Sequence, residues 1–271
     1  MNVIEFIPKK KIDKLLDFKD FDKINEMKMD KSEILNLPMV MGGKTVFLKE
    51  IFNVSFSSQK SNKTSIKIRN SNPNFINIGA NWRANNLTIY GSAGSFLGYK
   101  MRGGSIHVKG SAQNFVGCEM LDGKIYIEKN VGDFTGSANF GGRIGMRGGL
   151  IKIGGNAGNF VGQYLRRGTI IIKGDAGNNI CDSMIAGNVV VNGQCGQNMC
   201  QGMKRGTVVL NKFPRGVSQN FISCGIQELN FYSILKNAYL EGVKHSNKFK
   251  KFVGDRDNKG IGEILVSLSK N

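Results

Sequence analysis

A repeat of 19 residues constrains the fold of this chain more than any other feature. Short β-type runs recur at this spacing, with a single step of 26 residues. The residues that open the runs are Leu87, Ile106, Ile125, Ile151, Ile170, Val189 and Val208. Further columns in the same register hold Met101, Met120, Met146, Leu165, Met184 and Met203, and Gly104, Gly123, Gly149, Gly168, Gly187 and Gly206. Columns this regular indicate a tandem array of like units.

The units have the composition of β-strands. Runs such as SIHV, TIII and NVVV are rich in β-branched residues, and 19 residues are too few for a helical hairpin repeat. One unit cannot bury its own apolar side, but stacked units can, with equivalent residues about 4.8 Å apart. We therefore predict an all-β fold. It is a right-handed parallel β-helix, a single-stranded solenoid of about seven coils with small non-repeat caps at both ends.

Glycine is abundant, with 36 residues against only 4 prolines. Its columns fit corners that need φ > 0, or places where neighbouring coils approach closely. A phenylalanine column accompanies them, and we expect it to point inward and stack, like the methionine column. Its members are Phe96, Phe115, Phe134 and Phe160.

The chain divides into three parts. Residues 1–64 form a charged N-terminal segment and cap, with a short helix signal from Ser32. Residues 65–212 are the repeats, and residues 213–271 are a C-terminal cap or tail in which QELNFYSILKNAYLEGV predicts an amphipathic helix. The 26-residue step reflects seven extra residues between Gly136 and Met146. Such an insertion is either a loop on a binding face or a neutral bulge.

The formal net charge is +18, and the glycine-rich repeats carry most of the excess. Such a surface favours an anionic partner: an acidic protein, a nucleic acid, a membrane or a polyanionic cofactor. A general preference of the source for lysine would explain the lysines but not the ordered arginines. The position after the methionine column is repeatedly a basic residue, and in two units a second basic residue follows it. This basic ladder consists of Arg83, Arg102, Arg147, Arg166, Arg167, Lys204 and Arg205. The alternative interpretation is that these basic residues form an ordinary solvent-exposed face with no ligand.

The sequence offers no sign of catalysis or metal binding. His107 and His245 have no partner at metal or triad spacing, and the acids of the repeats do not cluster. The five cysteines are odd in number and lack a CxxC pair, so we expect reduced thiols in a cytoplasmic protein. No run of about 18 apolar residues suggests a membrane span. We predict no catalytic residues, no metal and no membrane partner.

Units of the form strand-G-x-x-G-x-x-x-G-x-x-M-x-x-G resemble a glycine-repeat domain shared by glutamate synthase and the glycine-repeat subunit of formylmethanofuran dehydrogenase. Three further segments are similar to the family of that subunit: LNLPMVMGGKTVFLKEIFNV, GSANFGGRIGMRGGLIKIGGNAG and FVGDRDNKGIGEILV. The last resembles the closing segment of the bacterial members, with Ile261 in place of a lysine. Gln113, Lys129, Cys181 and Cys200 depart from the glycine columns.

The resemblance implies a role that the residues alone do not show. Bacterial members belong to a formyltransferase/hydrolase complex, which moves a formyl group from formyl-tetrahydromethanopterin to a methanofuran analogue and hydrolyses it to formate. Formyltransferase and amidohydrolase-like subunits, the expected partners, hold the chemistry, and the glycine-repeat subunit is architectural. No cofactor is expected to bind this chain tightly. The methanofuran-type cofactor carries a polyglutamate tail, which the basic ladder could guide; docking of an acidic partner is the competing use.

Other functions stay open. The chain could be the glycine-repeat subunit of a tungsten or molybdenum formylmethanofuran dehydrogenase, or a glycine-repeat domain detached from a glutamate synthase. A polysaccharide lyase would need a carboxylate cluster that the repeats lack. A nucleic-acid binder would need aromatic side chains interleaved with the basic column, so no nucleic acid is expected.

Overall fold

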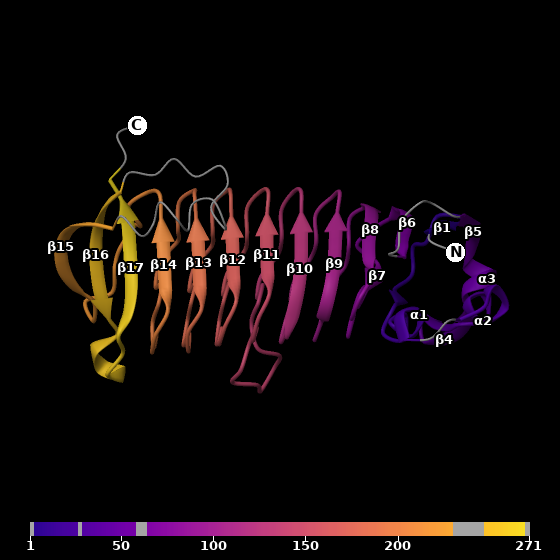
Figure 1. Ribbon diagram of the computed structural model, residues 1–271, viewed down its shortest axis with the longest axis horizontal. Helices are drawn as coiled ribbons and strands as arrows, with labels where there is room; N and C mark the ends of the chain where they lie inside the picture. Colours follow the sequence, from indigo (N-terminus) through magenta and orange to yellow (C-terminus); the bar gives the residue numbers. More distant parts are fainter. Residues whose placement is uncertain (1–2, 27–28, 58–63, 230–246, 269–271) are drawn as a thin grey trace.

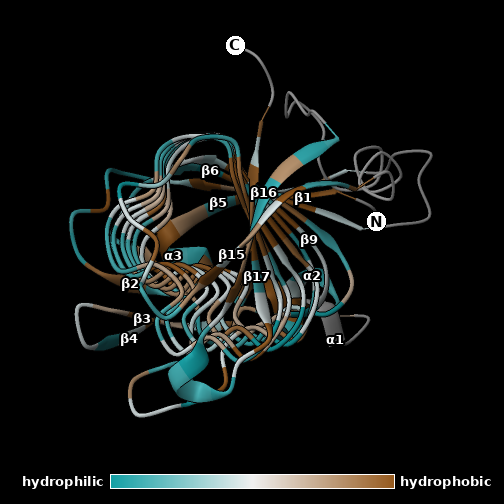
Figure 2. Ribbon diagram, turned by 90° about the vertical axis from the view of Figure 1, so that its left-hand side faces the viewer, coloured by the Kyte–Doolittle hydropathy of each residue, from teal (hydrophilic) through white to brown (hydrophobic). Residues whose placement is uncertain are grey.

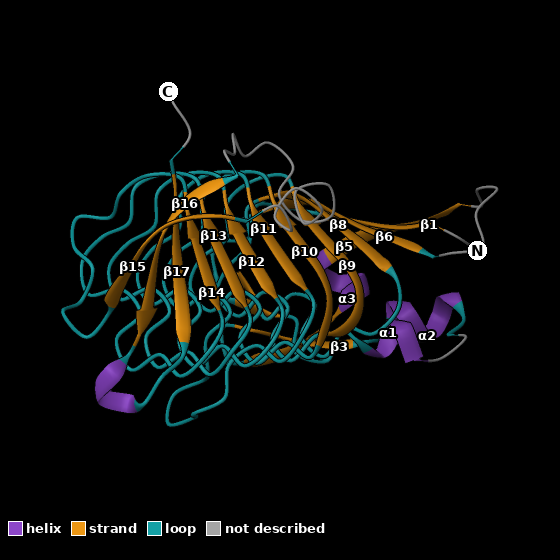
Figure 3. Cartoon of the chain, turned by 60° about the vertical axis from the view of Figure 1, so that its left-hand side comes forward, coloured by secondary structure: helices purple, strands orange, loops and turns teal. Residues whose placement is uncertain are grey.

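The computed structural model describes residues 3–26, 29–57, 64–229 and 247–268. Its fold is all-β, and its short helices lie toward the two ends of the described chain (Figures 1 and 3). A 13-stranded, mostly parallel sheet has the order β15-β16-β17-β14-β13-β12-β11-β10-β9-β8-β6-β1-β5. A second sheet has the order β4-β3-β2-β7.

The middle of the large sheet is an unbroken run of parallel strands, seen side by side in Figure 1. Their register follows the repeat: Ile106 lies opposite Ile125, and Ile125 lies opposite Ile151. The seven inserted residues therefore leave the strand pairing unchanged. The run consists of β6 (Ser65–Ser71), β8 (Asn86–Gly91), β9 (Arg102–Val108), β10 (Asp122–Ile127), β11 (Leu150–Ile153), β12 (Thr169–Ile172), β13 (Asn188–Val191) and β14 (Thr207–Leu210).

The turns between these strands stack as well. Isolated parallel bridges join Ala93 to Ala112 and Ala157 to Ala176, away from the main strands. The Gly117 amide donates to the Leu97 carbonyl (2.8 Å), one of many such bonds between consecutive units. In the view of Figure 2 the successive units largely overlap. Backbone hydrogen bonding between neighbours therefore continues outside the strands.

Apolar columns fill the space inside the units. The methionine column points inward as predicted, and Met101, Met120 and Met146 are fully buried. The strand column is also fully buried, as Ile106 and Ile125 illustrate. Burial of such columns is the main favourable contribution to folding.

The phenylalanine column contradicts the inward prediction. Its rings do stack, with centroids 4.7 to 4.9 Å apart and planes within 5°. However, only Phe115 is buried, and the other three rings are partly exposed. The next residue of each unit points inward instead, as fully buried Leu97 and Val116 show. The reason lies in the backbone, because all four phenylalanines have φ between 56° and 62°.

The glycine columns have the two causes that the sequence suggested. In one column, Gly104, Gly123 and their equivalents have positive φ. In another, the neighbouring unit occupies the place of a side chain. A Cβ on Gly158 would lie 2.1 Å from Asp133 Oδ1, which accepts a hydrogen bond from the Asn159 amide (2.7 Å). Only glycine leaves room for a side-chain oxygen that accepts a hydrogen bond from an amide of the next unit. We call this arrangement the asparagine-type ladder.

Two small assemblies cover the N-terminal end. β1 (Val3–Pro8) pairs in parallel with β6 and antiparallel with β5 (Phe52–Ser57). The second assembly is an aromatic cluster of buried rings such as Phe18, Phe75 and Trp82. The remaining elements are β2 (Leu16–Asp17), α1 (Lys23–Glu26), α2 (Lys31–Leu35), β3 (Pro38–Met41), β4 (Lys44–Phe47), α3 (Leu48–Ile51) and β7 (Phe75–Ile76). The helix expected near Ser32 is α2, which begins after the N-cap Asp30.

Three strands close the C-terminal end. β17 (Gly262–Ser267) continues the parallel run by pairing with β14, and β16 (Lys248–Gly254) and β15 (Ile222–Glu228) follow antiparallel. A short 3-10 helix, η1 (Arg256–Asn258), joins β16 to β17. Most of the helix predicted over 227–243 lies outside the described residues, and Gln227 and Glu228 belong to β15. The division at residues 65 and 213 stays a prediction.

Candidate functional site

The basic ladder lies where the strands begin, at the lower edge of the large sheet in Figure 1. Backbone hydrogen bonds align its residues from unit to unit. The amides of Arg102, Arg147 and Lys204 donate to the buried column of the preceding unit at 2.7 to 2.8 Å. All seven side chains are exposed: Arg83, Arg102, Arg147, Arg166, Arg167, Lys204 and Arg205. The structure therefore places the predicted ladder residues along one line.

The line is interrupted by apolar residues. Leu121 and Ile185 occupy the ladder position in two units, and both are partly buried. The Ile261 amide donates to the Lys204 carbonyl (2.8 Å), so Ile261 extends the line by one position, with a side chain 67% exposed. The ladder thus consists of short basic groups separated by apolar steps.

Most of the ladder side chains form no ion pair in the described part of the chain, although Asp122 lies opposite Arg102 in the next strand. Within residues 3–26, 29–57, 64–229 and 247–268, no ion pair holds the side chains of Arg102, Arg147, Arg166, Arg167, Lys204 or Arg205. Like charges on adjacent units, whose backbones lie about 4.8 Å apart, repel by at most about 1 kcal/mol per pair in water. A bound polyanion would relieve this repulsion.

The insertion forms a fixed loop beside the phenylalanine column, visible below β11 in Figure 1. The Asn139 amide donates to Glu119 Oε1 (3.2 Å), and Asn139 Nδ2 donates to Tyr99 Oη (3.4 Å). The Phe140 ring packs edge-on against Phe115, with centroids 4.9 Å apart. The loop thus folds back over two preceding units.

A hollow of about 380 Å³ lies between this loop and the rings. Phe115 and Phe134 of the column line it, together with Gln163 and Tyr164 of the next unit. The sequence singled out the insertion but did not show that it would close over the phenylalanine column. Its lining residues are Phe115, Phe134, Ala138, Asn139, Phe140, Gly141, Gly142, Arg143, Gln163 and Tyr164.

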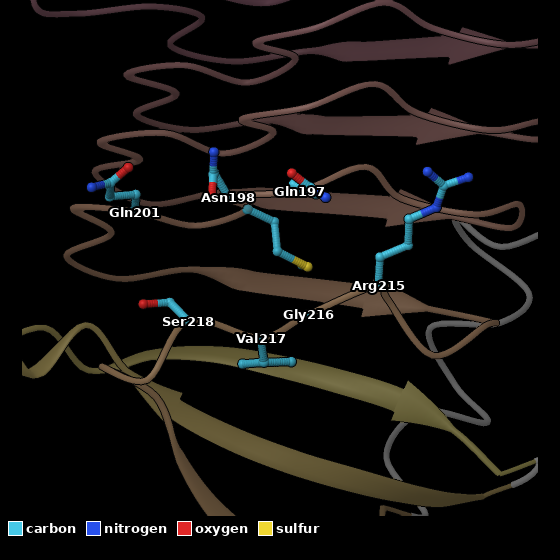
Figure 4. Close-up of a pocket in the computed structure, with 8 residues that line it drawn as sticks. Gln197, Asn198, Gln201, Arg215, Gly216, Val217 and Ser218 are labelled. Atoms are coloured by element: carbon cyan, nitrogen blue, oxygen red, sulfur yellow. The ribbon is translucent and has the colours of Figure 1, made fainter.

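A second hollow, of about 330 Å³, lies near the C-terminal end. Figure 4 shows Gln197, Asn198 and Gln201 of the last repeats facing the segment from Arg215 to Ser218. Sequence reasoning missed this hollow, because residues 215–218 lie outside the repeat. The Pro-Arg-Gly turn at Pro214 was the available signal.

The cysteine and histidine side chains that could react lie in surroundings that favour a structural role. Burial raises the pKa of the Cys118 and Cys195 thiols from 9.0 to about 12, and it raises that of Cys200 well above the ordinary value. Thiols protonated at neutral pH are poor nucleophiles. His107 contacts Glu128 (3.1 Å), whose pKa is lowered by a hydrogen bond from Lys109.

The described part of the chain holds neither a metal cluster nor a membrane-spanning helix. No group of three or more His, Cys, Asp or Glu side chains is arranged there to hold a metal ion. No helix there is long and apolar enough to cross a membrane.

Comparison with known proteins places the stacked units in a family. The model of the GXGXG motif family matches residues 48–246. The chain belongs to this family. No curated protein matches it. A chain of the formyltransferase/hydrolase complex from Methylorubrum extorquens, whose structure was solved with methylofuran, superposes with a TM-score of 0.85 at 25% identity.

The superposition covers 98% of the present chain and 100% of the Methylorubrum extorquens chain. The likeness therefore includes the non-repeat ends as well as the repeats. It confirms the resemblance to the bacterial formyltransferase/hydrolase complex that the sequence motifs suggested.

Proposed function

We propose that this chain is the non-catalytic structural subunit of a formyltransferase/hydrolase complex, in tetrahydromethanopterin-dependent oxidation of formaldehyde to formate. The observation that carries the proposal is the full-length superposition on a chain of such a complex. A detached repeat domain would match over the repeats alone. The partners are formyltransferase and amidohydrolase-like subunits, and the complex works in the cytoplasm, which five unpaired cysteines support.

The shape suits such a role. We propose that the stacked units wind as a right-handed parallel β-helix of about seven coils, with the non-repeat ends as caps. Parallel pairing of strands and bridges between turns support it. Seven coils at about 4.8 Å each give a rigid body roughly 34 Å long. Catalytic subunits docked along it would be held at fixed separation.

The basic ladder would guide the cofactor. A polyglutamylated methanofuran-type tail would lie along Arg83, Arg102, Arg147, Arg166, Arg167, Lys204 and Arg205. An extended peptide covers ~3.3–3.6 Å per residue, so about ten glutamates span the coils. Exposed ion pairs contribute only ~0.2–1 kcal/mol each, so the tail would be held weakly at many points and could move. Docking of an acidic subunit on the ladder is the competing use.

Two alternatives remain. A tungsten or molybdenum formylmethanofuran dehydrogenase would need further subunits around a similar chain. A glutamate-synthase-type domain would need no separate caps. The bacterial closing segment and the ends of the superposition favour the hydrolase-type complex.

Reconstitution tests the proposal. The chain is produced together with formyltransferase and amidohydrolase-like subunits from its own source, and formate release is measured with and without it. We expect no turnover by the chain alone and assembly of the subunits around it. Turnover by the isolated chain that a point mutation abolishes would contradict the non-catalytic role, and failure to assemble would contradict the structural one.

The ladder is tested by changing Arg102, Arg147 and Arg166 together to glutamine. If the ladder guides the tail, the complex assembles and KM for the polyglutamylated cofactor rises at low salt. Unchanged KM in an assembled complex contradicts guiding. Loss of assembly identifies the ladder as an interface.

A further inference from the structure

The partly exposed phenylalanine column is not required by the backbone at its position. Asn179 and Asn198 occupy the same place in the next two units, with the same left-handed φ of 56°. Left-handed φ is uncommon for residues other than glycine and is most often adopted by asparagine. Four phenylalanines in this conformation, three of them partly exposed, therefore call for a reason beyond the corner itself.

The geometry of the rings limits what they can bind. The column rings lie parallel to one another, 4.7 to 4.9 Å apart, so their faces are largely occupied by their neighbours. Sugars and nucleic-acid bases bind to ring faces, and these are not free within the column. The ring edges carry partial positive charge and attract carboxylates and carbonyl oxygens.

The insertion adds an apolar and a basic group at the same place. Phe140 is 77% exposed, the most exposed large hydrophobic side chain in the described ranges. Arg143 also lines the hollow, is exposed, and lies four residues before Arg147 of the basic ladder. Asn139 ties the loop to Glu119 and Tyr99, so Phe140 is presented from a fixed support.

We propose that this hollow is the anchor site for an acidic segment of another subunit of the complex. One apolar side chain of that segment enters the hollow and packs against the exposed part of Phe140 and the partly exposed Phe134. A neighbouring carboxylate of the segment meets Arg143, Gln163 and the ring edges. This inference rests on the proposed function for the existence of a partner subunit, and it adds the place and the chemistry of the contact.

Charge selects the partner over the alternatives. A second copy of this chain would bring another net charge of +18 to a face that already carries Arg143 and the ladder. A small ligand would be poorly enclosed, because Phe140, Gly141 and Arg143 of the rim are all exposed. An acidic protein segment satisfies both the apolar and the cationic parts of the site.

The test uses the assembled complex and two pairs of variants. Phe140→Ala and Arg143→Gln remove the apolar anchor and the charge. Phe213→Ala and Arg256→Gln are the matched controls, because these side chains are also exposed but lie on other parts of the surface. Affinity for each partner subunit is measured by biolayer interferometry, and thermal melting checks the fold of each variant.

We expect Phe140→Ala to weaken binding of one partner subunit about tenfold or more, as truncation of a central aromatic anchor does. Arg143→Gln should weaken it less, with a smaller salt dependence than wild type, and the controls should match wild type. A photocrosslinker, Phe140→p-benzoylphenylalanine, should mark a segment with an apolar residue beside Asp or Glu.

The outcomes separate this inference from the proposed function. If the wild-type chain assembles with its partners and Phe140→Ala binds equally well, the anchor site is refuted and the proposed function stands. A crosslink only to a second copy of this chain, or to a basic segment, also overturns the inference. Failure of the wild-type chain to assemble overturns the proposed function and the inference with it.

Discussion

The ring of Phe115 stacks on the ring of Phe134 with centroids 4.9 Å apart and planes 5° from parallel. The two residues belong to consecutive units, so the contact is a direct product of the 19-residue repeat. It lies on the outer side of a corner, where the backbone is left-handed at both residues. This stack links the fold to the insertion loop, because Phe140 packs on the same Phe115 ring.

The stack should contribute to stability in proportion to burial. Phe115→Ala removes a ring that is 6% exposed and has two stacked neighbours, and we expect the free energy of unfolding to fall by roughly 3 kcal/mol. Phe96→Ala, at the partly exposed end of the column, should cost about 1–2 kcal/mol. Urea denaturation measures both, and equal losses would contradict this account. Phe213→Ala should change stability by less than about 0.5 kcal/mol.

The glycine beside the asparagine-type ladder should not tolerate a side chain. Gly158→Ala places a Cβ only 2.1 Å from Asp133 Oδ1. The carboxylate must then move, which breaks the hydrogen bond that it accepts from the Asn159 amide. We expect a loss of about 1–3 kcal/mol in the free energy of unfolding. Gly216→Ala is the control, because nothing lies within 4 Å of its Cβ. In the double variant with Asp133→Ala the losses should be less than additive, and strict additivity would disprove the clash with the Asp133 carboxylate.

The basic ladder should gain strength if its line is extended. Ile261→Lys adds a charge next to Lys204 and should strengthen binding of a polyglutamate peptide by ~0.2–1 kcal/mol at low salt. The gain should shrink at high salt, because exposed charges are screened. Ile226→Lys is the control, since Ile226 is also 67% exposed but lies on β15. Calorimetry with the isolated chain decides, and equal gains from both variants would show general charge attraction rather than a ladder.

The buried thiols should make stability fall at alkaline pH. Cys118 and Cys195 have pKa values raised by burial from 9.0 to about 12. The unfolded chain therefore loses these protons first, so their contribution is intact below pH 9 and is lost as pH rises toward 12. Urea titrations at pH 8 and pH 10 should show a smaller alkaline loss in Cys118→Ala/Cys195→Ala than in wild type. An identical loss in both proteins would refute this contribution.

Much of the architecture follows from sequence periodicity. Ile125 and Ile151 pair across β10 and β11 although 26 residues separate them, because the repeat resumes in register after the insertion. The exposed position of Arg102, Arg147 and Arg166 also follows, since each comes directly after a buried column. The hollow beside the insertion could not be predicted, because it depends on contacts of Asn139 with Glu119 and Tyr99, from two earlier units.

The sequence by itself determined which residues stack on which, because a fixed period gives every residue the same neighbour in the next unit. The tertiary structure decided which columns face inward. Along a strand, side chains alternate between the two faces, so the direction of Ile106 can be predicted from its pattern. At a corner no such alternation holds. The left-handed backbone at Phe115 turns its side chain outward and leaves Val116 to fill the interior.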